Sequence, residues 1–94
     1  SGSVEDLKQA IEAYKEAVQQ APGFAAALYN LGQAYYFGRD LPAALNAYLS
    51  AVKANPKHAG AWHNLGIVYR DMGQQQLAVE AIEKAVQLNP MLLR

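Results

Sequence analysis

Apolar side chains recur at helical spacing along the chain. Leu28, Leu31 and Tyr35 lie at i, i+3 and i+7, which places them on one face of an α-helix. An equivalent stripe begins at Trp62. No segment shows the alternation of apolar and polar positions that is typical of a strand. The pattern therefore predicts helices over residues 4–20, 24–37, 41–54, 58–71 and 75–88.

The sequence also repeats itself with a period of 34 residues. Pro22, Pro56 and Pro90 are separated by this interval. So are four further pairs of identical residues or dipeptides: Leu31-Gly32 with Leu65-Gly66, Tyr35 with Tyr69, Ala44 with Ala78, and Ala51 with Ala85. Helix ends are expected before Pro56 and Pro90, because the residue that precedes a proline is pushed out of the α region. A fixed period of this length indicates a repeat architecture.

One stretch of the second period carries a recognisable motif. Trp62-x2-Leu65-Gly66-x2-Tyr69, followed by Ala78-x3-Ile82 and Pro90, resembles the tetratricopeptide repeat signature, with Ile in place of Phe. The resemblance implies an all-α solenoid, in which antiparallel helix hairpins stack into a right-handed superhelix. It divides the chain into a half repeat at residues 4–24, the second helix of a unit, and full repeats at residues 25–58 and 59–92.

The two ends of the chain and two internal positions depart from this scheme. Ser-Gly-Ser at residues 1–3 looks like a cloning scar, and residues 91–94 look like the first turn of another helix. Turns within the hairpins are expected at residues 38–40 and at Gly73. Gly38 stands one residue before the usual turn glycine, and Gln75 stands where a bulky apolar residue is common.

Composition and charge narrow the classes of partner. Eight Lys and Arg residues balance eight Asp and Glu residues, so the basic surface that nucleic-acid binding requires is not expected. The longest uncharged stretch, residues 17–38, contains several Gln, Asn, Pro and Gly residues and is not expected to span a bilayer. The sequence shows no signal-peptide pattern at its start. It does not identify a compartment, although the cytoplasm is favoured over the alternatives.

No catalytic or metal-binding constellation emerges from the sequence. Cys is absent, and His58 and His63 are five positions apart, which puts them on different faces of a helix. Ser50 is the one hydroxyl nucleophile beyond the first three residues, and no base is recognisable beside it. We therefore predict no catalytic residues, no metal, no cofactor and no enzymatic activity within this chain.

The candidate site lies on the first helix of each repeat, on the face away from the core stripe. In this family, these positions imply a concave groove that receives extended or helical peptides. The predicted partner-binding residues are Tyr29, Asn30, Gln33, Tyr36, Phe37, His63, Asn64, Ile67, Arg70 and Asp71. Aromatic rings suit partner recognition as anchors, and Asn side chains can pair with a peptide backbone. Alternatively, Tyr36 and Phe37 pack against neighbouring helices, and the asparagines bond within the chain or are merely exposed.

Two known ways in which this family binds peptides can be compared with these residues. Ala26, Gly60, Tyr29 and His63 stand where the cations of a carboxylate clamp would be, so a clamp is not expected. Asn30 and Asn64, each just before Leu-Gly, are similar to two rungs of the asparagine ladder in the O-linked N-acetylglucosamine transferase.

The function indicated by the sequence is a protein–protein interaction module that binds a peptide or a partner helix. One alternative is a substrate-selecting segment of a larger enzyme, such as a glycosyltransferase. Another is a self-assembling structural fragment, because neither end of the chain shows a polar cap and the uncovered ends could pair in a homo-oligomer.

Overall fold

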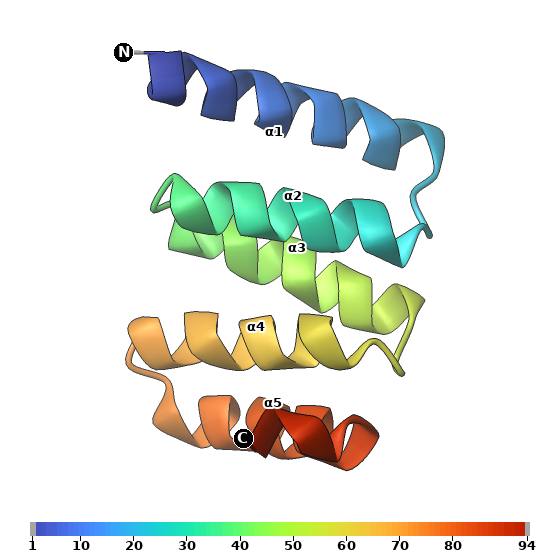
Figure 1. The fold of residues 1–94 in the computed structure, drawn as a ribbon, viewed down its shortest axis with the longest axis vertical. Helices are drawn as coiled ribbons and strands as arrows, with labels where there is room; N and C mark the ends of the chain where they lie inside the picture. The colour runs from blue at the N-terminus through green and yellow to red at the C-terminus, as the bar shows by residue number, and fades with distance from the viewer. Residues whose placement is uncertain (1, 94) are drawn as a thin grey trace.

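The computed structural model describes residues 2–93, which form an all-helical stack (Figure 1). Its elements are α1 (Gly2–Gln20), α2 (Ala25–Phe37), α3 (Leu41–Ala54), α4 (Ala59–Asp71), α5 (Gln75–Leu88) and the short 3-10 helix η1 (Pro90–Leu93). Residues 2–93 contain no strand. The predicted all-α solenoid is confirmed. Ser1 and Arg94, which belong to the predicted scar and the predicted last turn, lie outside the described residues.

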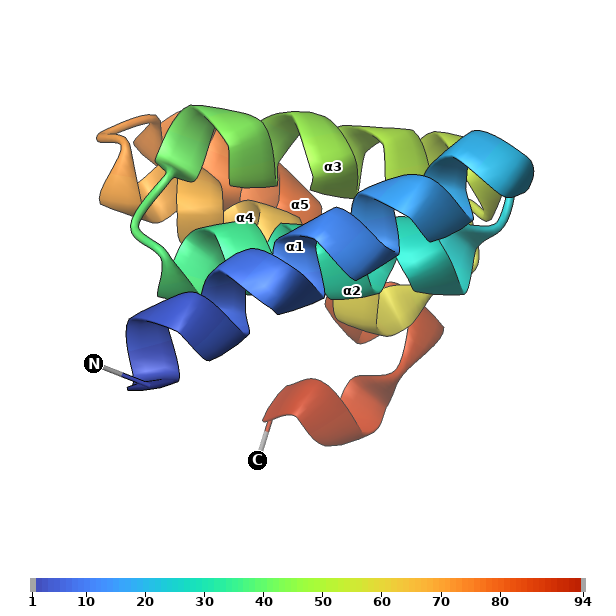
Figure 2. The same cartoon turned by 90° about the horizontal axis from the view of Figure 1, so that it is seen from above.

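The helices follow one another along the long axis of the molecule, with α1 and α5 at the two ends (Figures 1 and 2). The helices α2 and α3 form one antiparallel hairpin, and α4 and α5 form the next. The hairpins are joined by packing of α3 against α4, while α1 packs against α2. Each helix therefore contacts mainly its neighbours in the chain, which is the arrangement expected of a repeat protein.

N-cap side chains explain where α3 and α4 begin. The Oδ1 atom of Asp40 accepts a hydrogen bond from the Ala43 backbone N–H (3.2 Å), and Nδ1 of His58 accepts one from the Ala61 N–H (3.0 Å). Since an N-cap residue lies outside helical geometry, α4 begins at Ala59, one residue later than predicted. The predicted bounds of α3 and α5 are confirmed.

The two ends of the chain differ from the sequence prediction. Gly2 and Ser3 were expected to precede the first helix, but they form the first turn of α1. Glu5 lies in the same turn, where its negative charge favours a helix N-terminus. At the other end, η1 is a 3-10 helix rather than the first turn of another α-helix, and it directly follows α5.

The hairpin turns use the same backbone conformation with different residues. Gly73 has φ +82°, and Arg39, which is 34 positions earlier, has φ 66°. Both lie in the left-handed region, which glycine adopts without steric cost and an L side chain does not. Gly38 instead has φ −80°. Because Gly38 stands one residue too early in the first turn, Arg39 occupies the position that requires a positive φ.

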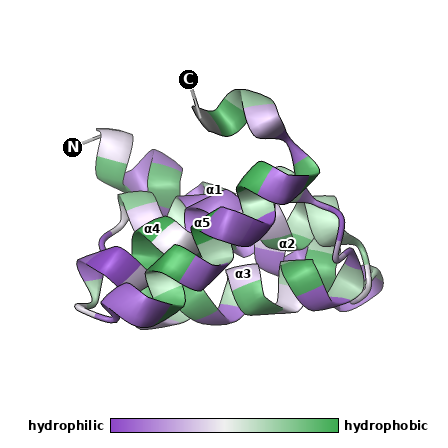
Figure 3. Ribbon diagram, turned by 90° about the horizontal axis from the view of Figure 1, so that it is seen from below, coloured by the Kyte–Doolittle hydropathy of each residue, from purple (hydrophilic) through white to green (hydrophobic). Residues whose placement is uncertain are grey.

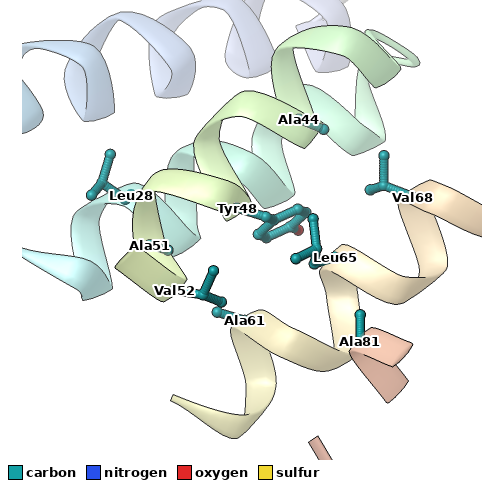
Figure 4. Close-up of a cluster of buried hydrophobic side chains, with 9 residues drawn as sticks. All are labelled: Leu28, Ala44, Tyr48, Ala51, Val52, Ala61, Leu65, Val68 and Ala81. Carbon is teal, nitrogen blue, oxygen red and sulfur yellow. The ribbon is translucent and has the colours of Figure 1, made fainter. Parts of the chain in front are cut away.

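The hydrophobic core lies where α2, α3 and α4 meet (Figure 4). Its buried members are Leu28, Ala44, Tyr48, Ala51, Val52, Ala61, Leu65, Val68 and Ala81. Two helical glycines allow close packing at its edge. A Cβ on Gly32 would lie 2.6 Å from Cε1 of Tyr48, and a Cβ on Gly66 would lie 2.6 Å from Cδ1 of Ile82. Glycine is therefore required at both positions for the side chain of the second helix to approach the first.

The two glycines make a matched pair for a stability test. Gly32→Ala is expected to overpack the rigid, buried Tyr48 ring at a cost of about 1–3 kcal/mol, reduced by roughly 1 kcal/mol because Ala is the better helix former. Gly66→Ala should cost less, because its closest contact, 2.6 Å from Cδ1 of Ile82, is with the flexible end of a half-buried side chain, while the backbone oxygen of Ala78 lies farther away at 3.1 Å. Urea unfolding followed by circular dichroism measures both. An equal or larger loss for Gly66→Ala would contradict this packing.

The first hairpin turn offers a stabilising substitution. Arg39→Gly is expected to raise the free energy of unfolding by about 0.5–1 kcal/mol, because relief of a left-handed L residue outweighs the added chain entropy. Gly73→Ala is the reverse control. Nothing lies within 4 Å of a Cβ at this position, so its destabilisation would report backbone strain alone. Thermal and urea unfolding of both variants check the prediction, which requires opposite signs.

Candidate functional site

A pocket of about 190 Å³ lies between the two repeats, at the junction of α2, α3 and α4. Its lining residues are Gln33, Tyr36 and Phe37 from α2, Tyr48 from α3, and Asn64 and Ile67 from α4. We call it the inter-repeat pocket. Five of its six lining residues belong to the set predicted from the sequence, and packing of α3 against α4 brings the two repeats' contributions together.

The apolar wall of the pocket includes an unusually exposed ring. Phe37, at the C-terminal end of α2, is 73% exposed. It makes an edge contact with Tyr36, with 6.4 Å between the ring centroids. Ile67 is half-buried on the facing helix. The alternative that Phe37 packs against neighbouring helices is therefore wrong, whereas Tyr36 is partly buried and does pack against the core.

The Tyr48 side chain is buried, but it contributes a hydroxyl group to the lining of the pocket. The residue is 2% exposed, yet it lines the pocket, and its hydroxyl oxygen accepts a hydrogen bond from Nδ2 of Asn64 (3.3 Å). Burial raises the pKa of Tyr48 to about 12, although the bond from Asn64 acts in the opposite direction. The hydroxyl therefore stays protonated at neutral pH, and its O–H remains a hydrogen-bond donor.

A hydrogen bond links the first helix of one repeat to the first helix of the next, beside the pocket. The hydroxyl of Tyr36 on α2 donates to Oδ2 of Asp71 at the end of α4 (2.5 Å). This bond holds the pKa of the Asp71 carboxyl below its usual value, and Arg70 acts in the same direction. It raises the pKa of Tyr36, with burial as a smaller cause. Arg70 also contacts Oδ1 of Asp71 at 3.4 Å. The Asp71 carboxylate therefore interacts with Tyr36 of one repeat and with Arg70 of the next.

The other predicted residues lie outside the pocket lining. The Tyr29 ring packs against the rings of Tyr48 and His58, at centroid distances of 6.0 and 4.7 Å, and its hydroxyl accepts a hydrogen bond from Gln33. Tyr29 is therefore part of the junction between the repeats. Asn30 and His63 are half-buried and do not line the pocket. Arg70 and Asp71 lie at its edge through their link to Tyr36.

Asn30 and Asn64, which the sequence suggests as two rungs of an asparagine ladder, differ in their hydrogen bonds within the described residues, and the ladder itself stays a prediction. Asn64 donates to Tyr48, whereas Asn30 makes no equivalent hydrogen bond to Tyr14, the residue 34 positions before Tyr48. The two asparagines thus have different surroundings, although each directly precedes Leu-Gly. Sequence reasoning also missed Tyr48 itself, because its second-helix position marks it as core and does not show that the hydroxyl reaches the pocket.

Residues 2–93 contain no group of three or more His, Cys, Asp or Glu side chains that could hold a metal ion. None of the helices formed by these residues has the length and apolar character needed to cross a membrane.

Comparison with known proteins places the chain among repeat proteins. Residues 3–65 and residues 59–92 each match the tetratricopeptide repeat family. Two solved structures, titled "Crystal structure of MamA" and "Crystal structure of MamA protein", superpose with TM-scores of 0.86 and 0.85 at 36% sequence identity. The matches cover 89% of this chain but only 49% and 46% of those chains, so it spans about half their length. No curated protein sequence matches the chain.

The link between Tyr36 and Asp71 can be tested directly by NMR. Tyr36→Phe removes the hydroxyl that stabilises the ionised carboxylate, so the pKa of Asp71 should rise toward its ordinary value of 3.8. Titration of the side-chain carboxyl carbons measures this shift. Phe37→Leu is the control, because it changes the adjacent ring and leaves the hydroxyl in place. An unchanged Asp71 pKa in Tyr36→Phe would show that the bond does not form in solution.

Proposed function

The chain belongs to the tetratricopeptide repeat family, and we propose that it is a protein-interaction module whose inter-repeat pocket binds an extended or helical peptide segment of a partner. Members of this family are in general non-catalytic interaction modules. The assignment of the inter-repeat pocket as the binding site rests on the residues that line the pocket, and not on the family.

One observation carries this proposal: an exposed phenylalanine borders a pocket that also holds unused hydrogen-bonding groups. Phe37 is 73% exposed on a structured helix, where an apolar ring gains nothing from contact with water. Large aromatic side chains dominate the binding energy of protein interfaces. The ring is therefore suited to contact an apolar side chain of a partner, with Ile67 on the other wall of the pocket.

The polar groups of the pocket suit a peptide backbone. The Tyr48 hydroxyl accepts from Asn64 and still has its own proton to donate. Gln33 and Asn64 use their NH₂ groups within the protein, which leaves their carbonyl oxygens as acceptors. A peptide offers one donor and one acceptor in each residue. The pocket thus combines an apolar anchor site with groups that can pair with main-chain N–H and C=O.

We also infer that the chain does no chemistry of its own. The polar groups at the pocket are amides, phenols and one carboxylate already bonded to Tyr36, and none forms a nucleophile–base pair. The alternative function, a substrate-selecting segment of a larger enzyme, would use the same pocket. The two functions therefore differ only in whether the parent polypeptide is an enzyme. The opposite charges of Arg70 and Asp71 lie side by side, which favours a protein partner over nucleic acid.

Binding is tested with peptides selected against the chain from a displayed random library. For these peptides, Phe37→Ala is expected to weaken binding by about 1–3 kcal/mol, roughly a 5- to 150-fold increase in Kd. Helicity and melting temperature should change little, because the ring is exposed. Isothermal calorimetry and circular dichroism give the two readouts.

Phe24→Ala is the matched control for this experiment. Phe24 is the other phenylalanine of the chain, is 59% exposed, and precedes α2 at the end far from Phe37. This substitution should leave peptide binding unchanged. Equal loss of affinity in both variants, or unchanged affinity in Phe37→Ala, would reject the inter-repeat pocket as the binding site.

A further inference from the structure

One hydrogen-bond donor of the inter-repeat pocket has no acceptor within the described part of the protein. The hydroxyl oxygen of Tyr48 accepts from Asn64, but no group of residues 2–93 accepts the hydroxyl proton. Burial raises the pKa of Tyr48 to about 12, so this proton is present at neutral pH. The residue is only 2% exposed although it lines the pocket, so the donor lies deep in it. A ligand that fills the pocket without accepting this proton leaves a buried donor unpaired, which is costly.

A hydrogen-bond acceptor lies next to this donor. Asn64 uses its NH₂ group on the Tyr48 hydroxyl, which leaves the Oδ1 atom of the same amide free to accept. Both side chains line the pocket and are bonded to each other, so the donor and the acceptor lie close together. A hydroxyl group accepts and donates through a single oxygen atom. It therefore matches this pair of groups.

Most of the remaining lining of the pocket is apolar. Phe37 and Ile67 contribute from the two facing helices, and the ring of Tyr36 lies in edge contact with that of Phe37. Figure 3 shows hydrophobic and hydrophilic segments alternating along the helices, which allows apolar walls and polar groups to meet at one site. The pocket has a volume of about 190 Å³. An apolar cavity of roughly 150 Å³ holds a benzene molecule, so there is room for one aromatic ring with a small substituent.

We infer that the partner inserts one tyrosine side chain into the inter-repeat pocket. Its ring lies against Phe37 and Ile67, and its hydroxyl accepts from Tyr48 and donates to Oδ1 of Asn64. Tyrosine combines a large apolar body with a polar end that needs a partner when it is buried. The inference rests on the proposed binding of a peptide at this pocket and names the residue that the pocket selects. The carbonyl oxygen of Gln33 remains available to the main chain of the peptide.

Other side chains satisfy fewer of these groups. Phenylalanine has no acceptor for the Tyr48 proton, and tryptophan, lysine and arginine carry donors only. An ionised aspartate or glutamate carries acceptors only and would lose its hydration beside the apolar walls. Neutral histidine has its donor and its acceptor on separate nitrogen atoms that point in different directions. Main-chain groups can pair with the same atoms, but a tyrosine meets both through one oxygen and also fills the pocket with its ring.

The sequences of the peptides selected from the displayed random library give the first test. Peptides that lose affinity for Phe37→Ala should share a tyrosine at one position. A shared phenylalanine or histidine at that position, or no shared aromatic residue, would overturn the inference. In that case the loss of affinity with Phe37→Ala would still support the inter-repeat pocket as the binding site. Failure of the tyrosine assignment is therefore distinguishable from failure of the proposed function.

A double-mutant cycle tests where the tyrosine hydroxyl binds. The shared tyrosine of a selected peptide is replaced with phenylalanine, and both peptides are titrated by isothermal calorimetry against the full chain and against its Tyr48→Phe variant. With the unsubstituted chain, the phenylalanine peptide should have a Kd at least about fivefold higher, because the Tyr48 proton is left unpaired. With Tyr48→Phe, the ratio of the two Kd values should fall at least about threefold. An unchanged ratio would overturn the inference.

Tyr35→Phe is the matched control for this cycle. Tyr35 is half-buried on α2 and does not line the inter-repeat pocket. Loss of its hydroxyl should leave the ratio of the two Kd values unchanged. An equal fall of the ratio in Tyr35→Phe and Tyr48→Phe would show that the effect does not arise in the pocket, and would overturn the inference.

A measurement on the unsubstituted chain does not depend on the folding of Tyr48→Phe. That variant keeps the ring that packs in the core, and circular dichroism checks its fold. In NMR spectra of the complex, the ring protons of the peptide tyrosine should show nuclear Overhauser effects to the methyl groups of Ile67 and to the ring of Phe37. Contacts of the tyrosine ring confined to another surface of the chain would overturn the inference.

Discussion

The Tyr48 ring occupies the space that a Cβ on Gly32 would need, 2.6 Å from its Cε1 atom, and this contact sets how closely α3 approaches α2. The ring is buried beneath α4 as well, where its neighbours in the core include Leu65 (Figure 4). Protein interiors are packed to the density of organic crystals, so the bulky Tyr48 ring must face a position without a side chain, which Gly32 provides. The position of α4 relative to the first repeat therefore depends on one aromatic residue and one glycine.

The candidate site is a consequence of the same packing. Because the Tyr48 ring extends through the core, its hydroxyl emerges between the repeats and meets Asn64. The hydrogen bond from Tyr36 to Asp71 then connects α2 to the C-terminal end of α4, beside the exposed ring of Phe37. A residue that stabilises the fold thus also provides the floor of the pocket, and the pocket forms only when both repeats are stacked.

Repetition also explains why the two ends of the molecule differ from its middle. Among the described residues, α3 packs against both α2 and α4, whereas α5 packs against α4 and is followed by the short η1. The side chains of these two second helices also differ. Where α3 has Leu41 and Tyr48, α5 has Gln75 and Ile82, which are more polar or smaller. The free face of α5 is therefore less apolar than the internal one, yet it keeps an apolar stripe at Val79, Ile82 and Val86.

The sequence by itself determined the helices, their hairpin order and the family, because a 34-residue period and a 3.6-residue periodicity are local properties of the chain. It also identified five of the six residues that line the inter-repeat pocket. Only the tertiary structure showed that Asn64 bonds to Tyr48 whereas Asn30 does not. It alone also showed that Phe37 is exposed whereas Tyr36 is half-buried. The local sequence around the members of each pair predicts similar roles for them. The tertiary structure also revealed Tyr48 at the pocket and the left-handed Arg39. The reason is physical: periodicity assigns a residue to a helix face, whereas burial and hydrogen-bond partners depend on which neighbouring helix covers that face and how closely it packs.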